Sequence, residues 1–234
     1  MSFFTRLQGV FFNPQFTLKA ISEKPIWVDT LIITLILLTI LSAFIVPIAQ
    51  KEGLQDMKNN VELRERMGEE RFQQRIDFME NPPKWYFFLT AIIMPIIAHL
   101  IGYLLPSLII LGMGRMFSTE GNYKQVFSVY LHASLIDRIF GNVVRLTLIL
   151  IRKSVIQTTT SLALFFPKLE TSSSGYKVLS QFDFFQLWFY GILGYGLSAI
   201  FKIELKKALV ISYGFWLIKS LLYIVLGLLF PQSM

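Results

Sequence analysis

Charged and polar side chains that could do chemistry are concentrated in one apolar stretch, residues 125–151. Asp137, Arg138 and Arg145 fall inside this stretch. Ser134 and Asp137 lie three residues apart and share one face of a helix, whereas Arg138 and Arg145, seven apart, share another. Charges at membrane depth are costly and usually face a cavity, a partner or one another. Three interpretations stay open: a path for a substrate or a proton, a buried structural pair, or a span that begins later.

Lys219 brings a further charge to the middle of the last apolar stretch. Its depth resembles that of Asp137, so opposite charges predict an ion pair between them, with the Ser134 hydroxyl as a second hydrogen-bond partner of Asp137. Arg138 is the competing cation, although adjacent residues on a helix do not face each other. His132 lies five residues before Asp137, well round the helix from it, and completes the candidate polar network.

Other catalytic chemistry has no basis in the sequence. There is no cysteine, and therefore no disulfide, thiolate nucleophile or cysteine metal site. The two histidines, His99 and His132, lie on different apolar stretches and have no evident further ligands. Zinc-protease, hydrolase and phosphate-loop motifs do not occur. We therefore predict no catalytic residue, no metal, no cofactor and no enzymatic activity.

The elements that position these residues are membrane helices. Hydrophobic residues make up 54% of the 234 residues and charged residues 16%, compared with about 25% charged residues in a soluble domain. Several apolar runs reach the roughly 20 residues needed to cross a bilayer. Residues 29–234 therefore predict an all-α integral membrane domain with five transmembrane helices, at about residues 30–49, 86–111, 125–151, 184–201 and 208–230.

The formal charge of +7 has a simple cause in such a chain. Lys and Arg flank membrane spans and meet anionic lipid, so the predicted partner is the lipid bilayer and not nucleic acid. The positive-inside rule favours a cytoplasmic N-terminus, although Arg152 and Lys153 count against it. The inside regions would then hold Arg6, Lys19, Lys24, Arg115, Lys124, Lys202, Lys206 and Lys207.

A charged segment, residues 50–84 (the arm), separates the first two spans. It contains seven basic and eight acidic residues, and Glu62 and Arg66 have the four-residue spacing of a solvated helix. The arm is either a charged helical hairpin in water or a docking surface for a partner. Two apolar stripes run along it, Leu54, Met57 and Val61 and then Phe72, Ile76 and Met79.

The N-terminal segment, residues 1–28, predicts two short amphipathic helices in the membrane interface. Ser2 could cap the first, Asn13 and Pro14 start the second, and Pro25 ends it. The alternative is that its aromatic residues pack on the protein's own spans. The predicted interface anchors are Phe3, Phe4, Phe11, Trp27 and Trp85.

Four segments carry a resemblance to a known family: FFNPQFTLKAISEKPIW (11–27), EGNYKQVFSVYLHAS (120–134), TTTSLALFFP (158–167) and residues 183–219. They resemble the Yip family of Ypt-interacting, multi-span membrane proteins in its prokaryotic branch. The resemblance implies five transmembrane helices and a cytosolic N-terminus. Eukaryotic members act in vesicle trafficking with Rab-type GTPases, and some prokaryotic members are thought to accompany ABC-type exporters.

Two functions follow as hypotheses. The first is a non-enzymatic adaptor or accessory subunit with a membrane-protein partner, in an ABC-type exporter or in trafficking machinery. The alternative is a small transporter or channel that uses the polar residues of the third span. The resemblance places either one in a prokaryotic inner (cytoplasmic) membrane.

Overall fold

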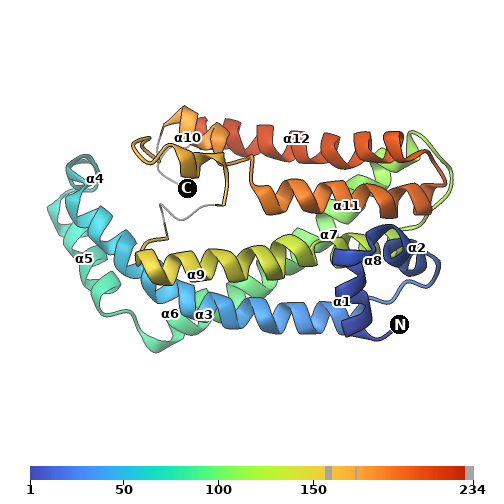
Figure 1. Ribbon diagram of the computed structural model, residues 1–234. Coiled ribbons are helices and arrows are strands. Elements are labelled where there is room, and N and C mark those ends of the chain that lie inside the picture. The colour runs from blue at the N-terminus through green and yellow to red at the C-terminus, as the bar shows by residue number, and fades with distance from the viewer. Residues whose placement is uncertain (156–159, 172, 230–234) are drawn as a thin grey trace.

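The computed structural model describes residues 1–155, 160–171 and 173–229, and these form an elongated bundle of helices (Figure 1). Within the described residues the only β feature is an isolated bridge between Ser161 and Asp183. The prediction of an all-α protein is therefore confirmed. Thr158 and Thr159 of the TTTSLALFFP segment and Phe230, the predicted end of the last span, lie outside the described residues.

Four helices are long and apolar enough to cross a membrane. The first is α3 (Val28–Asn59). The second is the continuous run of α6 (Lys84–Phe88), the π-helical turn η1 (Leu89–Ile93) and α7 (Met94–Arg115). The last two are α11 (Phe184–Phe201) and α12 (Leu205–Leu229). They correspond to four of the five predicted spans.

The third predicted span is an interrupted helix. It consists of α8 (Tyr123–Ala133), the π-helical turn η2 (Ile136–Gly141) and α9 (Asn142–Arg152). Every residue of α8 from Val126 to Ala133 is buried, so α8 is a core helix and not a lipid-facing one. The count of five spans stays a prediction, because this segment does not form one long helix.

The two N-terminal helices pack against the bundle. Ser2 Oγ accepts from the Thr5 amide at 3.2 Å and caps α1 (Phe3–Phe12). The next helix, α2 (Pro14–Glu23), has Pro14 in its first turn. It lies against α8 and α11 and contributes Leu18 and Ile21 to the core. The inner face of α2 is therefore bound to protein.

The arm is helical and partly continuous with the first span. Helix α3 runs ten residues beyond the predicted span end at residue 49, and α4 (Val61–Met67) and α5 (Glu69–Glu80) follow. Gly68, at φ 78°, provides the left-handed turn between them. Helix α5 folds back on α3, and the two apolar stripes of the arm pack against each other. The contacts involve Leu54, Met57, Phe72, Ile76 and Met79. Val61, the last residue of the first stripe, is exposed.

Figure 1 shows the two ends of the bundle. One end, here called the N-terminal end, holds α1, α2, the α7–α8 connection and the α11–α12 turn. The opposite end, the arm end, holds α4 and α5, together with η3 (Leu162–Phe165) and α10 (Ser174–Leu179). Helix α12 runs from the N-terminal end towards the arm end (Figure 1).

Candidate functional site

A polar cavity of about 340 Å³ lies inside the helix bundle, between α7, α8, η2, α9, α11 and α12. It gathers charged side chains from segments far apart in the sequence. We call it the polar cavity, and its polar lining consists of Tyr130, Asp137, Arg138, Asn142, Arg145, Gln186, Tyr190 and Lys219. It therefore brings together four of the six residues of the predicted polar network.

Arg145 holds two carboxylates at the edge of this cavity. Its Nη2 lies 2.7 Å from Asp137 Oδ1 and 2.9 Å from Asp183 Oδ1. Its Nε donates to Thr160 Oγ1 at 3.1 Å. Asp183 also caps α11, because its Oδ1 accepts from the amides of Phe185 and Gln186. Arg145 therefore forms salt bridges with two carboxylates.

The π-helical turn explains why Arg145 is the partner of Asp137. In a regular α-helix, residues eight apart point about 80° away from each other. A π-helical turn absorbs one additional residue, so the pair behaves like residues seven apart, which differ by only about 20°. Arg138 and Arg145, which the sequence placed on one face, both line the polar cavity.

Lys219 has a different partner from the one expected. Its Nζ donates to Gln186 Oε1 at 2.6 Å and lies 5.5 Å from the centre of the Tyr190 ring. In the described part of the chain Lys219 forms no salt bridge, so the predicted pair with Asp137 is wrong. Both side chains nevertheless line the polar cavity.

Arg138 also faces the cavity with neutral neighbours. Its Nη1 lies 3.3 Å from His99 Nδ1, and its guanidinium carbon is 5.6 Å from the centre of the Tyr103 ring. All aspartates and glutamates of the sequence are among the described residues, and Arg138 forms no salt bridge with any of them. Arg138 and Lys219 are therefore two cations inside the bundle that line the cavity with Asp137 but form no salt bridge with a described carboxylate.

Ser134 and His132, the remaining members of the predicted network, lie apart from this arrangement. The Ser134 hydroxyl donates to the Leu131 carbonyl at 2.7 Å, so the predicted hydrogen bond to Asp137 is wrong. The His132 ring is fully buried, and it joins a second polar cluster at the N-terminal end.

Arg6 is the centre of this second cluster. Its Nε donates to His132 Nε2 at 3.0 Å, and its Nη2 forms an ion pair with Asp29. Thr30 Oγ1 lies 2.9 Å from the same imidazole nitrogen. His132 Nδ1 faces the Ser128 carbonyl at 2.7 Å, so Nδ1 carries the proton and Nε2 accepts. The sequence did not predict the burial of Arg6, because a single basic residue in a short amphipathic helix is typical of an exposed position.

The predicted interface anchors divide into two groups. The ring of Phe11 packs edge-on against Phe140 and Trp188, with centroids 5.4 and 5.7 Å away. Trp27 packs on Phe127. The remaining three have no such place in the bundle: Phe4 and Trp85 are exposed, and Phe3 is half-buried beside Phe4.

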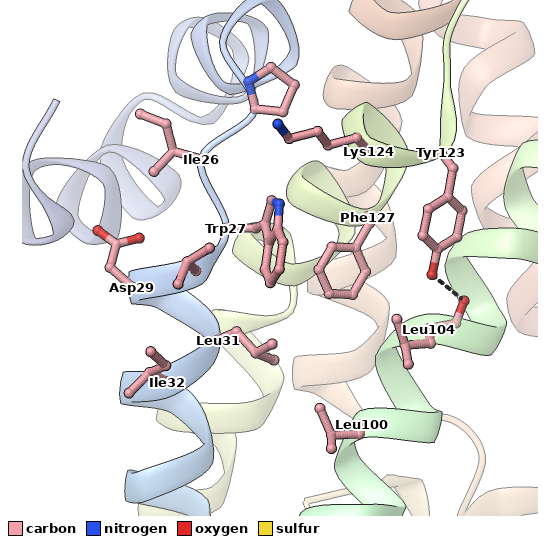
Figure 2. A pocket seen from close by; sticks show the side chains of 12 residues that line it. Ile26, Trp27, Asp29, Leu31, Ile32, Leu100, Leu104, Tyr123, Lys124 and Phe127 are labelled. Atoms are coloured by element: carbon pink, nitrogen blue, oxygen red, sulfur yellow. Dashed lines mark hydrogen bonds between the residues drawn. The ribbon is translucent and has the colours of Figure 1, made fainter.

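A second hollow, an apolar groove of about 890 Å³, lies where α3, α7 and α8 meet (Figure 2). Lys124 stands at its rim, and the Tyr123 hydroxyl donates to the Leu104 carbonyl at 3.1 Å. Its two charged lining residues are Asp29, which is paired with Arg6, and Lys124 at the rim. The other lining side chains are mainly apolar, so the polar cavity is the stronger candidate site. The walls are formed mainly by Trp27, Leu31, Leu100, Leu104 and Phe127.

The cavity also lacks the means for metal chemistry. Among the described residues, no group of three histidine, aspartate or glutamate side chains could hold a metal ion. Its side chains can fix charges at membrane depth and donate hydrogen bonds. These properties suit the binding or passage of a charged group.

The four long apolar helices define the class: an integral membrane protein with several spans. The family model of the Yip1 domain matches residues 9–227. The chain therefore belongs to the Yip1 domain family, as the four segments of the sequence indicated. No curated protein and no solved structure matches the chain significantly.

Proposed function

We propose that this Yip family protein is a non-enzymatic adaptor or accessory subunit of a membrane complex, with a second membrane protein as its partner. The arm supports this function. Met57 of α3 packs on Phe72 and Ile76 of α5, so the arm has a small core of its own. Ion pairs within it include Lys58–Glu80 at 2.5 Å and Arg66–Glu62 at 2.9 Å. A rigid, charged element held beyond the bundle suits the docking of a protein.

We further propose five transmembrane passages with the N-terminus in the cytoplasm. The distribution of cations supports this orientation, because the N-terminal end of the bundle gathers exposed basic residues and basic residues concentrate on the cytoplasmic side. The arm would then face the other side of the membrane. The exposed cations at the N-terminal end are Lys19, Lys24, Arg115, Lys124, Lys202, Lys206 and Lys207.

We assign the protein to the prokaryotic branch and to the inner (cytoplasmic) membrane. The resemblance of its four segments supports the branch. Because some members of that branch are thought to accompany ABC-type exporters, such an exporter is the proposed complex, and trafficking machinery is the eukaryotic counterpart. The short amphipathic α1, with Phe4 exposed at its surface, would lie in the cytoplasmic interface.

Cross-linking in native membranes, identified by mass spectrometry, tests the adaptor function. Arg71 and Arg75 are exposed on α5, and their double change to Glu reverses charge on the arm alone. The matched control is the double change of Lys206 and Lys207 to Glu at the opposite end. We expect the arm variant to lose about tenfold of the partner cross-link, equivalent to ~1.4 kcal/mol. An equal yield in both variants, or no partner linked to the arm, would refute the proposal.

The alternative, a small transporter or channel, is favoured by one observation, the polar cavity between the helices. Cavities of this kind mark substrate and ion pathways in membrane proteins. Flux measurements in liposomes separate the two functions. Solute or ion flux by the isolated protein that Lys219→Met abolishes would support transport, whereas an inactive isolated protein that needs its partner would support the adaptor.

A further inference from the structure

We propose that the polar cavity binds one singly charged anionic group, a carboxylate or a phosphodiester, between Arg138 and Lys219. This inference concerns the interior of the bundle and does not depend on the adaptor function of the arm.

The balance of charge is the first argument. The cluster contains three cations, Arg138, Arg145 and Lys219, and two carboxylates, Asp137 and Asp183. Both carboxylates are bound to Arg145. The cluster therefore carries one net positive charge inside an apolar bundle, where an uncompensated charge is costly. One bound monoanion would neutralise it.

The unused hydrogen-bond donors are the second argument. A guanidinium has five N–H donors and an ammonium has three. Among the described residues, Arg138 makes one side-chain hydrogen bond, to His99, and Lys219 makes one, to Gln186. The remaining donors belong to residues that line the same cavity. A planar guanidinium beside an ammonium suits an oxyanion, which accepts several such bonds.

The choice of partners around both cations is the third argument. The guanidinium carbon of Arg138 lies 5.6 Å from the centre of the Tyr103 ring. The Nζ atom of Lys219 lies 5.5 Å from the centre of the Tyr190 ring. Aromatic faces and a neutral amide stabilise a cation only modestly. They keep both side chains in place while leaving their charges available to a ligand.

Asp137 determines which anions fit. It lines the cavity beside both free cations, so a dianion would leave the cluster with a net negative charge. A monoanion would leave it neutral. The cavity volume, about 340 Å³, is at the lower end of the range for small-molecule sites. It suits a single headgroup or small solute, with the phosphodiester of an anionic phospholipid and a soluble carboxylate as the two sources.

Thermal unfolding of the detergent-purified full-length protein tests the proposal. The soluble probes are dimethyl phosphate and acetate as monoanions, sulfate as a dianion, and chloride as the ionic-strength reference. The lipid probe is phosphatidylglycerol added to the micelles, with phosphatidylcholine as its reference. We expect a monoanion or phosphatidylglycerol to raise the midpoint of unfolding above its reference, and sulfate to have a smaller effect. A response to the lipid alone identifies a headgroup, and a response to the soluble anions alone identifies a solute.

The variants Arg138→Gln and Lys219→Gln each remove one of the free cations, and each should weaken the apparent affinity at least about tenfold. Lys206→Gln removes the same charge from an exposed position and should keep the wild-type response. If either cavity variant does not fold, Asp137→Asn replaces it, because this change should raise the response to sulfate relative to dimethyl phosphate. No response of the wild type to any monoanionic probe, or an equal response in the cavity variants and Lys206→Gln, would overturn the proposal.

Discussion

At the scale of single residues, the two polar clusters have different roles. Arg6 connects the first helix to His132, which is 126 residues away in the sequence, and thereby fixes the N-terminal segment on the core. In the polar cavity the engaged pair Arg145–Asp137 lies beside two cations with neutral partners. The Arg6 cluster is structural, because its charged groups are paired with one another. In the polar cavity, Arg138 and Lys219 keep hydrogen-bond donors that no described residue uses.

Replacement of Arg6 should destabilise the protein strongly. Arg6→Ala removes the guanidinium that donates to His132 and pairs with Asp29, and it leaves Thr30 as the remaining hydrogen-bond partner of His132 Nε2 and of the Asp29 carboxylate. The Asp29 side chain is 44% exposed, which lowers the cost, so we expect a loss of about 1–3 kcal/mol. Arg66→Ala in the arm removes an exposed i,i+4 pair and should cost less than about 1 kcal/mol. Thermal unfolding in detergent measures both, and equal shifts would show that Arg6 does not anchor α1.

The ion pair between Arg64 and Glu69 predicts a pH effect confined to the arm. The hydrogen bonds from Arg64, at 2.5 and 2.8 Å, lower the pKa of Glu69 to about 2. Because the folded-state pKa is lowered from its usual 4.5, the contribution is complete above that value and disappears as the pH falls towards 2. NMR titration of the carboxylate should show a midpoint near 2 in the wild type. Arg64→Gln should move the midpoint upwards, and an unchanged midpoint would exclude Arg64 as the cause.

At the scale of elements, α8 is the centre of the bundle. It contacts α1, α2, α7 and α11, and its Val129 side chain lies against Gly196 of α11. A Cβ at position 196 would lie 2.2 Å from Val129 Cγ1, so only glycine permits this close approach of the two helices. The close packing of α8 against α11 thus depends on glycine at position 196.

Gly196→Ala should therefore destabilise the protein by about 1–3 kcal/mol through overpacking. The matched control is Gly112→Ala on α7, where a new Cβ would have no neighbour within 4 Å. That change should be neutral or stabilise by up to about 1 kcal/mol, since alanine favours helix. Unfolding midpoints of both variants measure the difference. A neutral Gly196→Ala would show that the α8–α11 contact is looser than described.

Local patterns in the sequence predicted much of this scale correctly. The Ser2 cap and the end of α2 before Pro25 depend on neighbouring residues. The contact between α3 and α5 that joins the apolar residues of the arm is tertiary and was not predicted. The burial of α8 could not be predicted, because an apolar helix in the core and one in lipid have similar hydropathy. The pairing of Asp137 with Arg145 was not predicted, because the π-helical turn changes the direction of the side chains that follow it. The spacing of apolar residues in the sequence does not reveal a π-helical turn.

At the scale of the whole molecule, the bundle separates two ends with different charge. The N-terminal end is net positive, because its exposed cations outnumber its exposed acids Glu23, Glu120 and Glu204. The arm, with seven basic and eight acidic residues, is nearly balanced. The polar cavity lies between these ends. An adaptor of this design would present the arm to a partner on one side while its basic end meets anionic lipid on the other.

The most direct test of the account is the topology, measured by single-cysteine accessibility. The chain has no native cysteine, so Lys19→Cys and Glu70→Cys each introduce one exposed thiol, at the N-terminal end and in the arm. In intact spheroplasts, a membrane-impermeant maleimide should label position 70 at once and position 19 only after the membrane is permeabilised. Labelling of both positions from the same side would show that α3 does not cross the membrane, and it would contradict the separation of the arm from the basic end.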